Sequence, residues 1–212
     1  MLHLWLVRHG ESTWNAAGRV QGWADPPLTE RGIRQARRVA ERLSTLEVTA
    51  LYTSPQVRAV QTAEVIAEAT GVAPRVDARL REHGMGEATG HKWDEIITRW
   101  PHLLEYAHRG EAVRPHIPKT EPEADFYARV EAVFDEIVAR HDEGDIVIVG
   151  HGGTFRGFFA VRFNIPRETY LGLRFGNASV TLAEIERPGW MNVHYVNDTS
   201  HLRDGAEGEK DT

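Results

Sequence analysis

The sequence predicts an α/β fold with a mainly parallel central sheet flanked by helices on both faces. Two observations lead to this prediction. Short apolar runs typical of buried strands alternate along the chain with longer segments whose apolar residues recur at the helical period. The length of 212 residues suits one domain with an insertion. Strands that alternate with helices favour parallel pairing, because the connection between two such strands is a helix packed on the sheet.

The first strand and the first long helix come early in the chain. Residues 2–7 form a continuous apolar run, which is the pattern of a strand buried on both faces. Thr29 is the expected N-cap of the helix that follows. That helix is predicted from apolar residues spaced three or four apart: Ile33, Ala36, Ala40, Leu43 and Leu46.

A second strand, a second helix and a weaker third strand are expected next. The second strand is short and spans residues 50–52. Ser54 and Pro55 are expected to begin the helix as N-cap and first helical residue, and Gly71 is expected to end it. The third strand is predicted over residues 75–80.

Residues 91–122 break this alternation and are predicted to form a helical insertion. One or two short helices are expected around Pro101. Five apolar or aromatic residues could line a pocket or pack the insertion down: Trp93, Trp100, Leu103, Leu104 and Tyr106. The insertion also contains four histidines: His91, His102, His108 and His116. Since no two of these histidines have a ligand spacing with carboxylate support, we expect no metal site.

The alternation of helices and strands returns after the insertion. A strong helical stripe begins near residue 123 and is expected to close at Gly144. Residues 146–149 are the clearest buried strand in the chain, and residues 154–163 are expected to be helical. Residues 179–185 and 192–196, joined by a Pro-Gly pair at 188–189, are predicted to form a hairpin. The oligomeric state stays open, with a homodimer formed through this hairpin as one option.

Composition limits the functional classes. Asp and Glu number 31 against 25 Lys and Arg, for a net charge of −6, which argues against binding to nucleic acid or to an anionic membrane. The absence of cysteine excludes disulfides, thiolate metal sites and thiol nucleophiles. No apolar stretch reaches the length of a membrane span or resembles a signal peptide. We expect a cytoplasmic protein with one domain over residues 1–202 and a disordered tail over residues 203–212.

Two of the predicted strands end in the same kind of sequence. The first strand ends in Arg8 and His9 followed by a glycine, and the strand over 146–149 leads into His151, Gly152 and Gly153. In an open α/β sheet, ligands bind beyond the carboxyl ends of the strands. Glycines let the backbone approach a ligand closely, and the start of a following helix favours an anion. Two histidines at equivalent strand ends indicate a binding site rather than two structural histidines.

Arg58 and Arg8 indicate that the ligand of this site is an anion. Arg58 falls in the first turn of the helix after residues 50–52, where the helix dipole disfavours a cation. Arg8 adjoins a buried strand and therefore needs a partner. The planar guanidinium suits phosphate geometry. The residues themselves thus predict a site for a tetrahedral anion, with histidine as nucleophile or as acid–base catalyst.

The same segments resemble the signature of the histidine phosphatase superfamily, which includes cofactor-dependent phosphoglycerate mutases. The resemblance begins with Leu-Val-Arg-His-Gly-Glu-Ser-Thr-Trp-Asn at residues 6–15. It continues in the family's order through further segments: 19–22, 25–29, 54–59, 61–63, 150–153 and 197–202. These motifs span nearly the whole chain, and their combination is very specific. The resemblance implies the phosphoglycerate mutase-like α/β fold, with residues 91–122 in the position of a lid.

The resemblance also implies roles for the catalytic residues. His9 would attack phosphorus and carry the phosphoryl group as a phosphohistidine. Arg8, Arg58 and His151 would hold the non-bridging oxygens, where stabilising charge matters most. Glu82 aligns with the family's general acid, which protonates the leaving oxygen and then activates water. As alternatives, Glu82 could be a surface glutamate paired with a neighbouring arginine, and three other carboxylates are weaker candidates for the acid: Glu11, Asp25 and Glu87.

Four further residues are expected to contact the phosphate or the rest of the substrate: Asn15, Gln21, Gly152 and Arg156. Asn15 resembles the family's neutral phosphate contact, although it could also cap a helix or turn. Gln21 resembles a polar neighbour of the pocket, although it could also be a surface residue. Gly152 could donate its backbone N–H, and Arg156, one turn into the following helix, could contact a second anionic group.

The sequence after Glu82 favours a phosphatase over a mutase. Mutases of the family have Glu-Arg-His-Tyr-Gly here, whereas this chain has Glu-His-Gly-Met-Gly over residues 82–86. The paired lid arginines of the mutases are not evident, since Arg109 and Arg114 are isolated. Many family phosphatases instead have Glu-x-x-Phe-Gly-x-Trp-Glu-Gly, and this chain has Glu-His-Gly-Met-Gly-Glu-Ala-Thr-Gly over residues 82–90. The spacing matches and the aromatic is replaced, so the pocket wall must differ, which leaves the substrate rather than the reaction open. The resemblance therefore favours a histidine acid-type phosphatase that hydrolyses small phosphorylated metabolites with neither metal nor cofactor. A 2,3-bisphosphoglycerate-dependent mutase is the alternative, and a non-catalytic phospho-ligand-binding scaffold is a more distant one.

Overall fold

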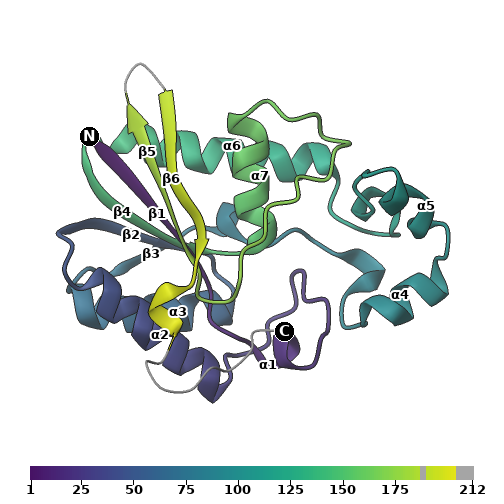
Figure 1. The fold of residues 1–212 in the computed structure, drawn as a ribbon, viewed down its shortest axis with the longest axis horizontal. Helices are drawn as coiled ribbons and strands as arrows, with labels where there is room; N and C mark the ends of the chain where they lie inside the picture. Colours follow the sequence, from purple (N-terminus) through teal and green to yellow (C-terminus); the bar gives the residue numbers. More distant parts are fainter. Residues whose placement is uncertain (187–189, 204–212) are drawn as a thin grey trace.

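The structure is a computed structural model that describes residues 1–186 and 190–203. Its six strands form one sheet in the order β3-β2-β4-β1-β5-β6 (Figure 1). Four strands are parallel: β1 (Leu2–Arg8), β2 (Val48–Thr53), β3 (Pro74–Val76) and β4 (Gly144–Gly150). The other two are antiparallel and complete one edge: β5 (Val180–Glu186) and β6 (Trp190–Asp198). The predicted mainly parallel sheet is confirmed.

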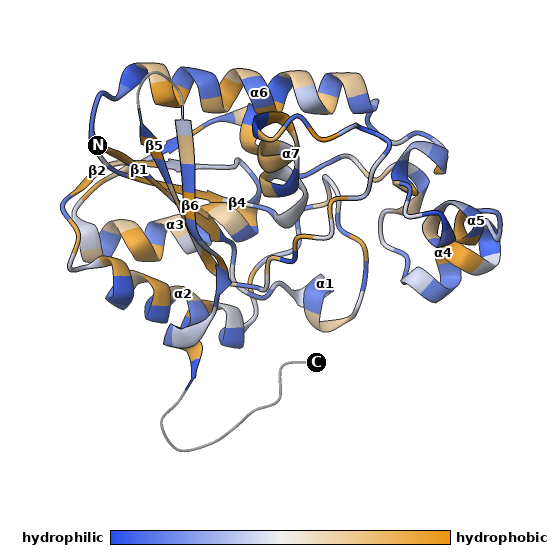
Figure 2. Ribbon diagram, turned by 45° about the horizontal axis from the view of Figure 1, so that its top comes forward, coloured by the Kyte–Doolittle hydropathy of each residue, from blue (hydrophilic) through white to orange (hydrophobic). Residues whose placement is uncertain are grey.

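Helices cover both faces of this sheet, as predicted. α2 (Glu30–Leu43) and α3 (Val57–Thr70) pack on one face, and α6 (Glu123–Arg140) and α7 (Gly152–Arg162) pack on the other (Figures 1 and 2). Successive side chains of β4 point to opposite faces of the sheet. Ile146 and Ile148 pack in the core under α6 and α7, whereas Val147 and Val149 pack in the core under α2 and α3. A strand buried on both faces explains its continuous apolar sequence.

The segment over residues 91–122 lies to one side of these layers (Figure 1). It contains two short helices on either side of Pro101, α4 (Trp93–Arg99) and α5 (Leu103–His108). Its Ile96, Leu103 and Ile117 form a small apolar cluster with Met85 and Ala88 of the preceding chain. The remaining helical elements are short: α1 (Thr13–Ala16) and the 3-10 turns η1 (Ala78–Leu80), η2 (Gly86–Ala88), η3 (Arg114–His116) and η4 (Ser200–Leu202).

Two predicted helix boundaries are confirmed and have clear local causes. The Thr29 side chain caps α2 by accepting the Gly32 N–H at 3.0 Å, as a threonine N-cap should. Gly71 ends α3 in the left-handed region, with φ of 73°.

Other boundaries were predicted wrongly. The N-cap of α3 is Gln56 and not Ser54, since the Ser54 hydroxyl contacts a histidine of the neighbouring strand end instead. Gly144 does not close α6, which ends at Arg140; it is the first residue of β4. α7 begins at Gly152 rather than at residue 154, because its two initial glycines carry no apolar signal.

The third strand is also shorter than the predicted 75–80. Only Pro74–Val76 pair with β2, and Ala78–Leu80 turn into a 3-10 helix. Asp77 causes the turn, because its carboxylate accepts the Arg79 N–H at 2.8 Å and so caps η1. The chain after η1 is therefore irregular when it reaches Glu82.

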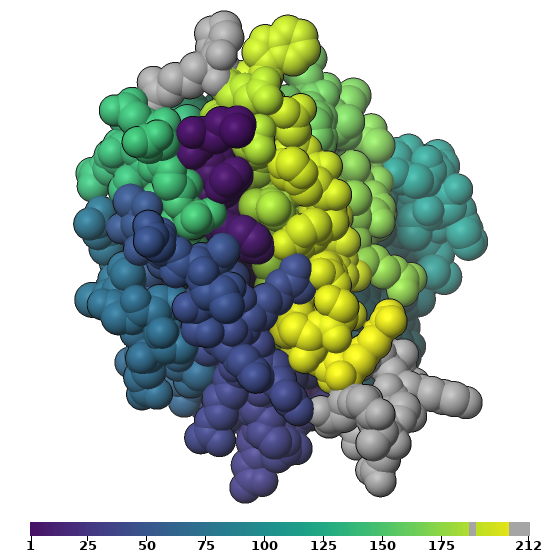
Figure 3. All heavy atoms as spheres, turned by 60° about the vertical axis from the view of Figure 1, so that its left-hand side comes forward, coloured from purple at the N-terminus to yellow at the C-terminus, as the bar shows by residue number. Residues whose placement is uncertain are grey.

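The predicted C-terminal hairpin is present as the antiparallel pair β5 and β6, although its Pro-Gly connection at 188–189 lies outside the described residues. In Figure 3, β6 and η4 run along the surface beside α2, to which the Arg42 side chain joins them through Asp198 at 2.7 Å and the Tyr195 hydroxyl at 2.9 Å. A homodimer formed through this hairpin stays a prediction. The predicted tail lies outside the described residues apart from Arg203. In the described ranges, no helix combines the length and the apolar content needed to cross a bilayer.

Candidate active site

A cavity of about 450 Å³ opens at the carboxyl ends of β1 and β4. Its inner wall, at the sheet, is formed by four residues at strand ends or helix starts, Arg8, His9, Arg58 and Gly153, and by Glu82 from the irregular chain after η1. Its outer wall is formed by residues of the 91–122 segment and of the chain after α7: Trp93, Ala112, Val113, Arg114 and Tyr170. The topology thus places the residues with reactive side chains on the wall nearest the sheet, as expected for an open α/β fold.

His9 is held as a neutral imidazole whose Nε2 carries no proton. It is 2% exposed, and its Nδ1 lies 2.7 Å from the Gly10 carbonyl. Since a carbonyl only accepts, Nδ1 carries the ring proton and Nε2 is left with its lone pair. Burial lowers the pKa of His9 well below its usual value, and the charges of Arg8 and Arg58 lower it further. His9 is therefore unprotonated at Nε2 over the whole neutral range.

Arg58 is a buried cation and Arg8 a half-buried one, and the charges of both act on His9. Arg58 is 1% exposed; its Nε lies 3.3 Å from His9 Nε2, and its Nη atoms donate to the carbonyls of Gly22 and Ala24. Arg8 donates to the Phe175 carbonyl. Burial lowers the pKa of each guanidinium to about 10. Neither arginine has a carboxylate within ion-pair distance in the part of the chain that the structure describes, so the pair suits an anion supplied from outside.

Glu82 faces the same space with both carboxylate oxygens hydrogen-bonded. They accept the backbone N–H groups of His83 at 2.8 Å and Gly153 at 3.0 Å. Burial raises the pKa of Glu82, but the His83 N–H, the charge of Arg156, the Gly153 N–H and the charge of Arg58 together bring it below its usual value. Glu82 is therefore a half-buried residue of the cavity wall and not a surface glutamate paired with its neighbour.

His151 lies directly behind His9 rather than on the cavity wall. It is fully buried as the N-cap residue of α7, with its ring centre 5.1 Å from that of His9. Its Nε2 lies 2.7 Å from the Ser54 hydroxyl, and its buried Nδ1 has no hydrogen-bond partner. Burial and the charges of Arg58, His9 and Arg8 lower the pKa of His151 well below its usual value. Gly152, next in the chain, also lies off the wall and packs beside Arg8.

Asn15 and Gln21 both line the cavity. The Asn15 Oδ1 accepts the Ser12 N–H at 3.1 Å and closes a capping box on α1, so Asn15 is a helix cap and a wall residue at once. Gln21 is only 9% exposed and accepts the Ser12 hydroxyl at 2.8 Å, so the surface interpretation is wrong. Arg156 also lines the cavity, where its guanidinium lies over the Tyr170 ring.

The structure excludes from the wall the other carboxylates considered for the general acid. Asp25 accepts the Val57 N–H at 2.6 Å, Glu11 accepts the Thr29 hydroxyl at 2.8 Å, and Glu87 pairs with two basic residues at the surface. None of the three lines the cavity. Within residues 1–186 and 190–203, no group of three or more histidine or acidic side chains is arranged to hold a metal ion.

Asn177 is the main site residue that the sequence did not reveal. Its side-chain amide donates to the carbonyls of His9 at 3.2 Å and Gly10 at 3.3 Å, and to Asn15 Oδ1 at 3.2 Å. It thereby fixes the backbone that carries the reactive histidine. No periodicity or motif marks the irregular chain that contains it. Ser54 lies in a motif that was recognised, so its contact with His151 could have been suspected.

The outer wall uses few of the residues that the sequence offered for it. Of the five apolar candidates in the insertion, only Trp93 lines the cavity. Trp100 and Leu103 belong to the small apolar cluster, Tyr106 stacks on a histidine ring, and Leu104 is exposed.

Arg114 is the one basic residue of the insertion that reaches the wall, whereas Arg109 pairs with Glu111 at the surface. The insertion and the chain after α7 are joined by two backbone bonds, from Ala112 N–H to the Glu168 carbonyl at 2.9 Å and from Tyr170 N–H to the Gly110 carbonyl at 3.1 Å.

The chain belongs to the histidine phosphatase superfamily, whose branch 1 family model matches residues 4–198. A protein of Yersinia pestis described as "Probable phosphoglycerate mutase GpmB" is 33% identical over 209 residues, which are 95% of each chain. Among solved structures, Bacillus stearothermophilus YhfR is 33% identical with a TM-score of 0.84, and the match covers 96% of this chain and 100% of that one.

Two solved phosphatases are also similar. A mycobacterial glucosyl-3-phosphoglycerate phosphatase in complex with VO3 is 31% identical with a TM-score of 0.84, over 94% of this chain and 100% of its own. A phosphoserine phosphatase from Entamoeba histolytica, in complex with 3-phosphoglyceric acid, is 27% identical with a TM-score of 0.82, over 96% of this chain and 100% of its own. The fold is therefore that of the superfamily, and both mutases and phosphatases occur among its relatives.

Proposed function

We propose that this protein is a phosphomonoesterase that hydrolyses small phosphorylated metabolites through a phosphohistidine on His9. The observation that carries the proposal is the inner wall. There a neutral histidine with an unprotonated Nε2, the guanidinium groups of Arg8 and Arg58 with no carboxylate in ion-pair distance, and the carboxylate of Glu82 all face a single cavity. A nucleophile, charges for a phosphate and a group for proton transfer are the three requirements of phosphoryl transfer to an enzyme side chain.

In the first step, His9 Nε2 attacks the phosphorus atom and the bond between phosphorus and the ester oxygen breaks. Arg8 and Arg58 hold the non-bridging oxygens as charge develops on them. His151 lies just off the cavity wall, and we assign it as a further donor on its unused ring nitrogen: with the Ser54 hydroxyl donating to Nε2, the Nδ1 carries the ring proton and has no other partner. The leaving oxygen takes its proton from the carboxyl group of Glu82, which leaves an alcohol and the phosphohistidine.

Because the pKa of Glu82 is low, its carboxyl group is ionised when the site holds no anion. The proton that it donates to the leaving oxygen must therefore be taken up when the substrate binds. A phosphoryl dianion placed next to the carboxylate raises its pKa, because two like charges in one buried site cannot both be fully ionised at little cost. Glu82 is thus an ionised group when the site holds no anion and becomes an acid when the phosphate arrives. We expect the acid to be used more efficiently as the pH falls.

In the second step, a water molecule attacks the phosphorus atom of the phosphohistidine. Glu82, now a carboxylate, takes a proton from this water, the bond from nitrogen to phosphorus breaks, and neutral His9 and inorganic phosphate are restored. The same carboxyl group therefore donates in one direction and accepts in the other. Neither step uses a metal ion or a cofactor.

The acceptor of the phosphoryl group separates the two enzymatic alternatives. A mutase must exclude water and offer a substrate hydroxyl instead. The presence of a single basic insertion residue, Arg114, on the outer wall supports the phosphatase, as do the two phosphatases among the similar structures. The relatives named as mutases favour the alternative, a 2,3-bisphosphoglycerate-dependent mutase. A scaffold that only binds phospho-ligands would be expected to have lost one of the catalytic side chains.

The experiment that tests the proposal is a panel of phosphorylated metabolites at several pH values. Phosphate release and the interconversion of 3- and 2-phosphoglycerate are scored in the same samples, with and without a chelator. We expect phosphate release that survives the chelator. Interconversion with little phosphate release would establish the mutase, and neither activity on any member would leave the scaffold.

A further inference from the structure

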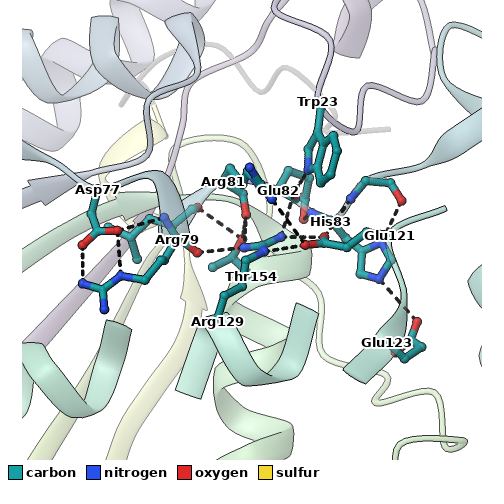
Figure 4. Close-up of polar contacts among 12 residues, drawn as sticks. Trp23, Asp77, Arg79, Arg81, Glu82, His83, Glu121, Glu123, Arg129 and Thr154 are labelled. Atoms are coloured by element: carbon teal, nitrogen blue, oxygen red, sulfur yellow. Dashed lines mark hydrogen bonds and ion pairs between the residues drawn. The ribbon is translucent and has the colours of Figure 1, made fainter. Parts of the chain in front are cut away.

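The segment that carries Glu82 has almost no regular structure to hold it. η1 ends at Leu80, and the chain over residues 81–85 is neither helix nor strand. A general acid must nevertheless be placed accurately, because a shift of about 1 Å in a reacting group costs about 10²-fold in rate. Figure 4 shows what replaces regular structure here: the side chains of Trp23, Glu121, Arg129 and Thr154, from four other parts of the fold, converge on the backbone of residues 79–84.

Arg129 of α6 makes the largest contribution. Its Nη1 donates to the carbonyls of Arg79 at 2.7 Å and Arg81 at 2.8 Å, and its Nη2 donates to the carbonyl of Glu82 at 3.0 Å. Its Nε and Nη2 also donate to the two oxygens of Glu121 at 2.6 and 2.7 Å. All five N–H groups of the guanidinium are thereby used, three of them on the segment that carries Glu82.

Glu121 extends this contact to the other side of Glu82. Its Oε2 accepts the Gly84 N–H at 3.1 Å, and its own N–H donates to the Gly84 carbonyl at 3.0 Å. The side chains of the pair are 11% and 3% exposed. Arg129 and Glu121 together therefore grip the backbone from residue 79 to residue 84, with Glu82 between the two points of contact.

Three further side chains complete the enclosure of the Glu82 backbone. Trp23 donates to its carbonyl at 2.8 Å, Gln56 accepts its N–H at 2.8 Å, and the Thr154 hydroxyl donates to the Arg81 carbonyl at 2.9 Å. Each comes from a separate element, but each makes only one or two contacts with the segment. Arg129 is the group through which three carbonyl groups of this backbone are tied to α6.

We propose that Arg129 and Glu121 are positioning residues that place the Glu82 carboxyl group for proton transfer to the leaving oxygen. The proposal rests on the proposed function, since it gives Glu82 the role of acid. The pair acts through geometry rather than charge, because the carboxylate of Glu121 neutralises the guanidinium beside it. Neither side chain lines the cavity, so neither contacts the substrate.

Lysine cannot replace arginine in this arrangement. An ammonium group has three N–H donors and no planar fork, so it can serve either the carbonyls or the carboxylate but not both sets. The substitution Arg129→Lys keeps the charge and most of the volume. It therefore isolates the hydrogen-bond geometry, which is the property that the proposal invokes.

The test compares two substrates that differ in their need for an acid. The value of kcat/KM reports events up to the formation of the phosphoenzyme. It is measured with p-nitrophenyl phosphate, whose leaving group needs little protonation, and with glycerol 2-phosphate, whose alkoxide needs a proton. For Arg129→Lys we expect a loss of about 10²-fold with glycerol 2-phosphate and of less than about threefold with p-nitrophenyl phosphate. Glu82→Gln should show the same selectivity with a larger loss.

A second variant and a matched control separate positioning from general damage. Glu121→Gln replaces one of the two acceptor oxygens with an NH2 donor, which must face an N–H group of Arg129 or of Gly84 whichever way the amide turns. It should shift the ratio of kcat/KM for the two substrates in the same direction. Arg79→Lys is the control, since Arg79 belongs to the same segment and pairs with Asp77 at 2.6 Å and Glu136 at 2.8 Å, away from Glu82 (Figure 4). It should leave the ratio unchanged.

Each outcome of this experiment decides the proposal. If Arg129→Lys and Glu121→Gln slow both substrates equally, or leave the ratio as it is in the wild-type protein, the positioning role is overturned while the phosphatase function stands. If the wild-type protein releases phosphate from neither substrate, or Glu82→Gln does not change the ratio, the role of Glu82 fails first and the positioning role falls with it. A thermal midpoint for each variant shows whether a loss of folded protein contributes.

Discussion

The inner and outer walls of the cavity are built from different kinds of structure. On the inner wall, His9 and Arg58 are 2% and 1% exposed and lie at the junctions between sheet and helices. On the outer wall, Trp93 and Tyr170 are 47% and 54% exposed and come from a short helix and an irregular segment. The inner wall is thus fixed by the two main cores, while the outer wall depends on one small cluster and a few backbone bonds.

From this difference we infer that the inner wall carries out the phosphoryl transfer and that the outer wall selects the substrate. Groups that transfer a phosphoryl group must be accurately placed and shielded from water, which the end of a doubly covered sheet provides. A wall of partly exposed aromatic and basic side chains can change without disturbing the core. The predictions below test this division, beginning with the change expected to have the largest effect.

Removal of a buried inner-wall cation should be the most damaging change. Arg58→Ala removes a charge that faces the phosphate and also the donor nearest to His9 Nε2. We expect kcat/KM for p-nitrophenyl phosphate to fall by about 10²- to 10³-fold, which is the scale for loss of one transition-state donor. Steady-state kinetics check this. A loss below tenfold would mean that the inner wall does not bind the phosphoryl group as described.

The pH dependence tests the electrostatics of the inner wall. Because the pKa of Glu82 is lowered, its protonated fraction declines as the pH rises through the neutral range. Because the pKa of His9 is lowered well below its usual value, the nucleophile stays neutral as the pH falls. The ratio of kcat/KM for glycerol 2-phosphate to that for p-nitrophenyl phosphate should therefore rise toward acidic pH, by up to about tenfold per pH unit. A ratio that rises toward alkaline pH in the wild-type protein, or that still varies in Glu82→Gln, would contradict this assignment.

Changes on the outer wall should have smaller effects that depend on the substrate. Trp93→Ala and Tyr170→Ala should raise KM several-fold for the larger members of the metabolite panel. Inhibition by inorganic phosphate, which contacts only the inner wall, should change by less than about twofold, since rim contacts contribute little to its binding. Inhibition constants and KM values measured side by side provide the check. If the substitutions changed the inhibition constant of phosphate as much as KM, the claim that the outer wall contacts only the rest of the substrate would be wrong.

The sequence revealed the layers and the inner wall because both rest on short patterns. A buried strand followed at once by His9 or His151 places those side chains at the ligand-binding edge with no further information. Gln21 and Glu82 could be placed only through the resemblance to the family. Of these four residues, His9, Gln21 and Glu82 line the cavity and His151 lies beside His9.

The contacts that complete the site could not be predicted in this way. Asn177 and Arg129 reach the site from an irregular segment and from the middle of a long helix, and nothing in their neighbouring residues marks them. Their importance depends on which carbonyl groups the folded chain leaves unpaired nearby. The strand predicted over residues 75–80 was too long for a related reason. The Asp77 carboxylate accepts a backbone N–H group that a continuing strand would use in pairing. Side-chain to backbone bonds between distant segments carry no periodic signal.

The most direct test of the central claim is to capture the phosphoenzyme. The protein is mixed rapidly with p-nitrophenyl phosphate, quenched in alkali, under which phosphohistidine survives, and digested for mass spectrometry. The account predicts one phosphoryl group on the peptide that contains His9, a burst of p-nitrophenol before the steady state, and neither signal in His9→Ala. A phosphoryl group on any other residue, or full turnover by His9→Ala, would contradict it.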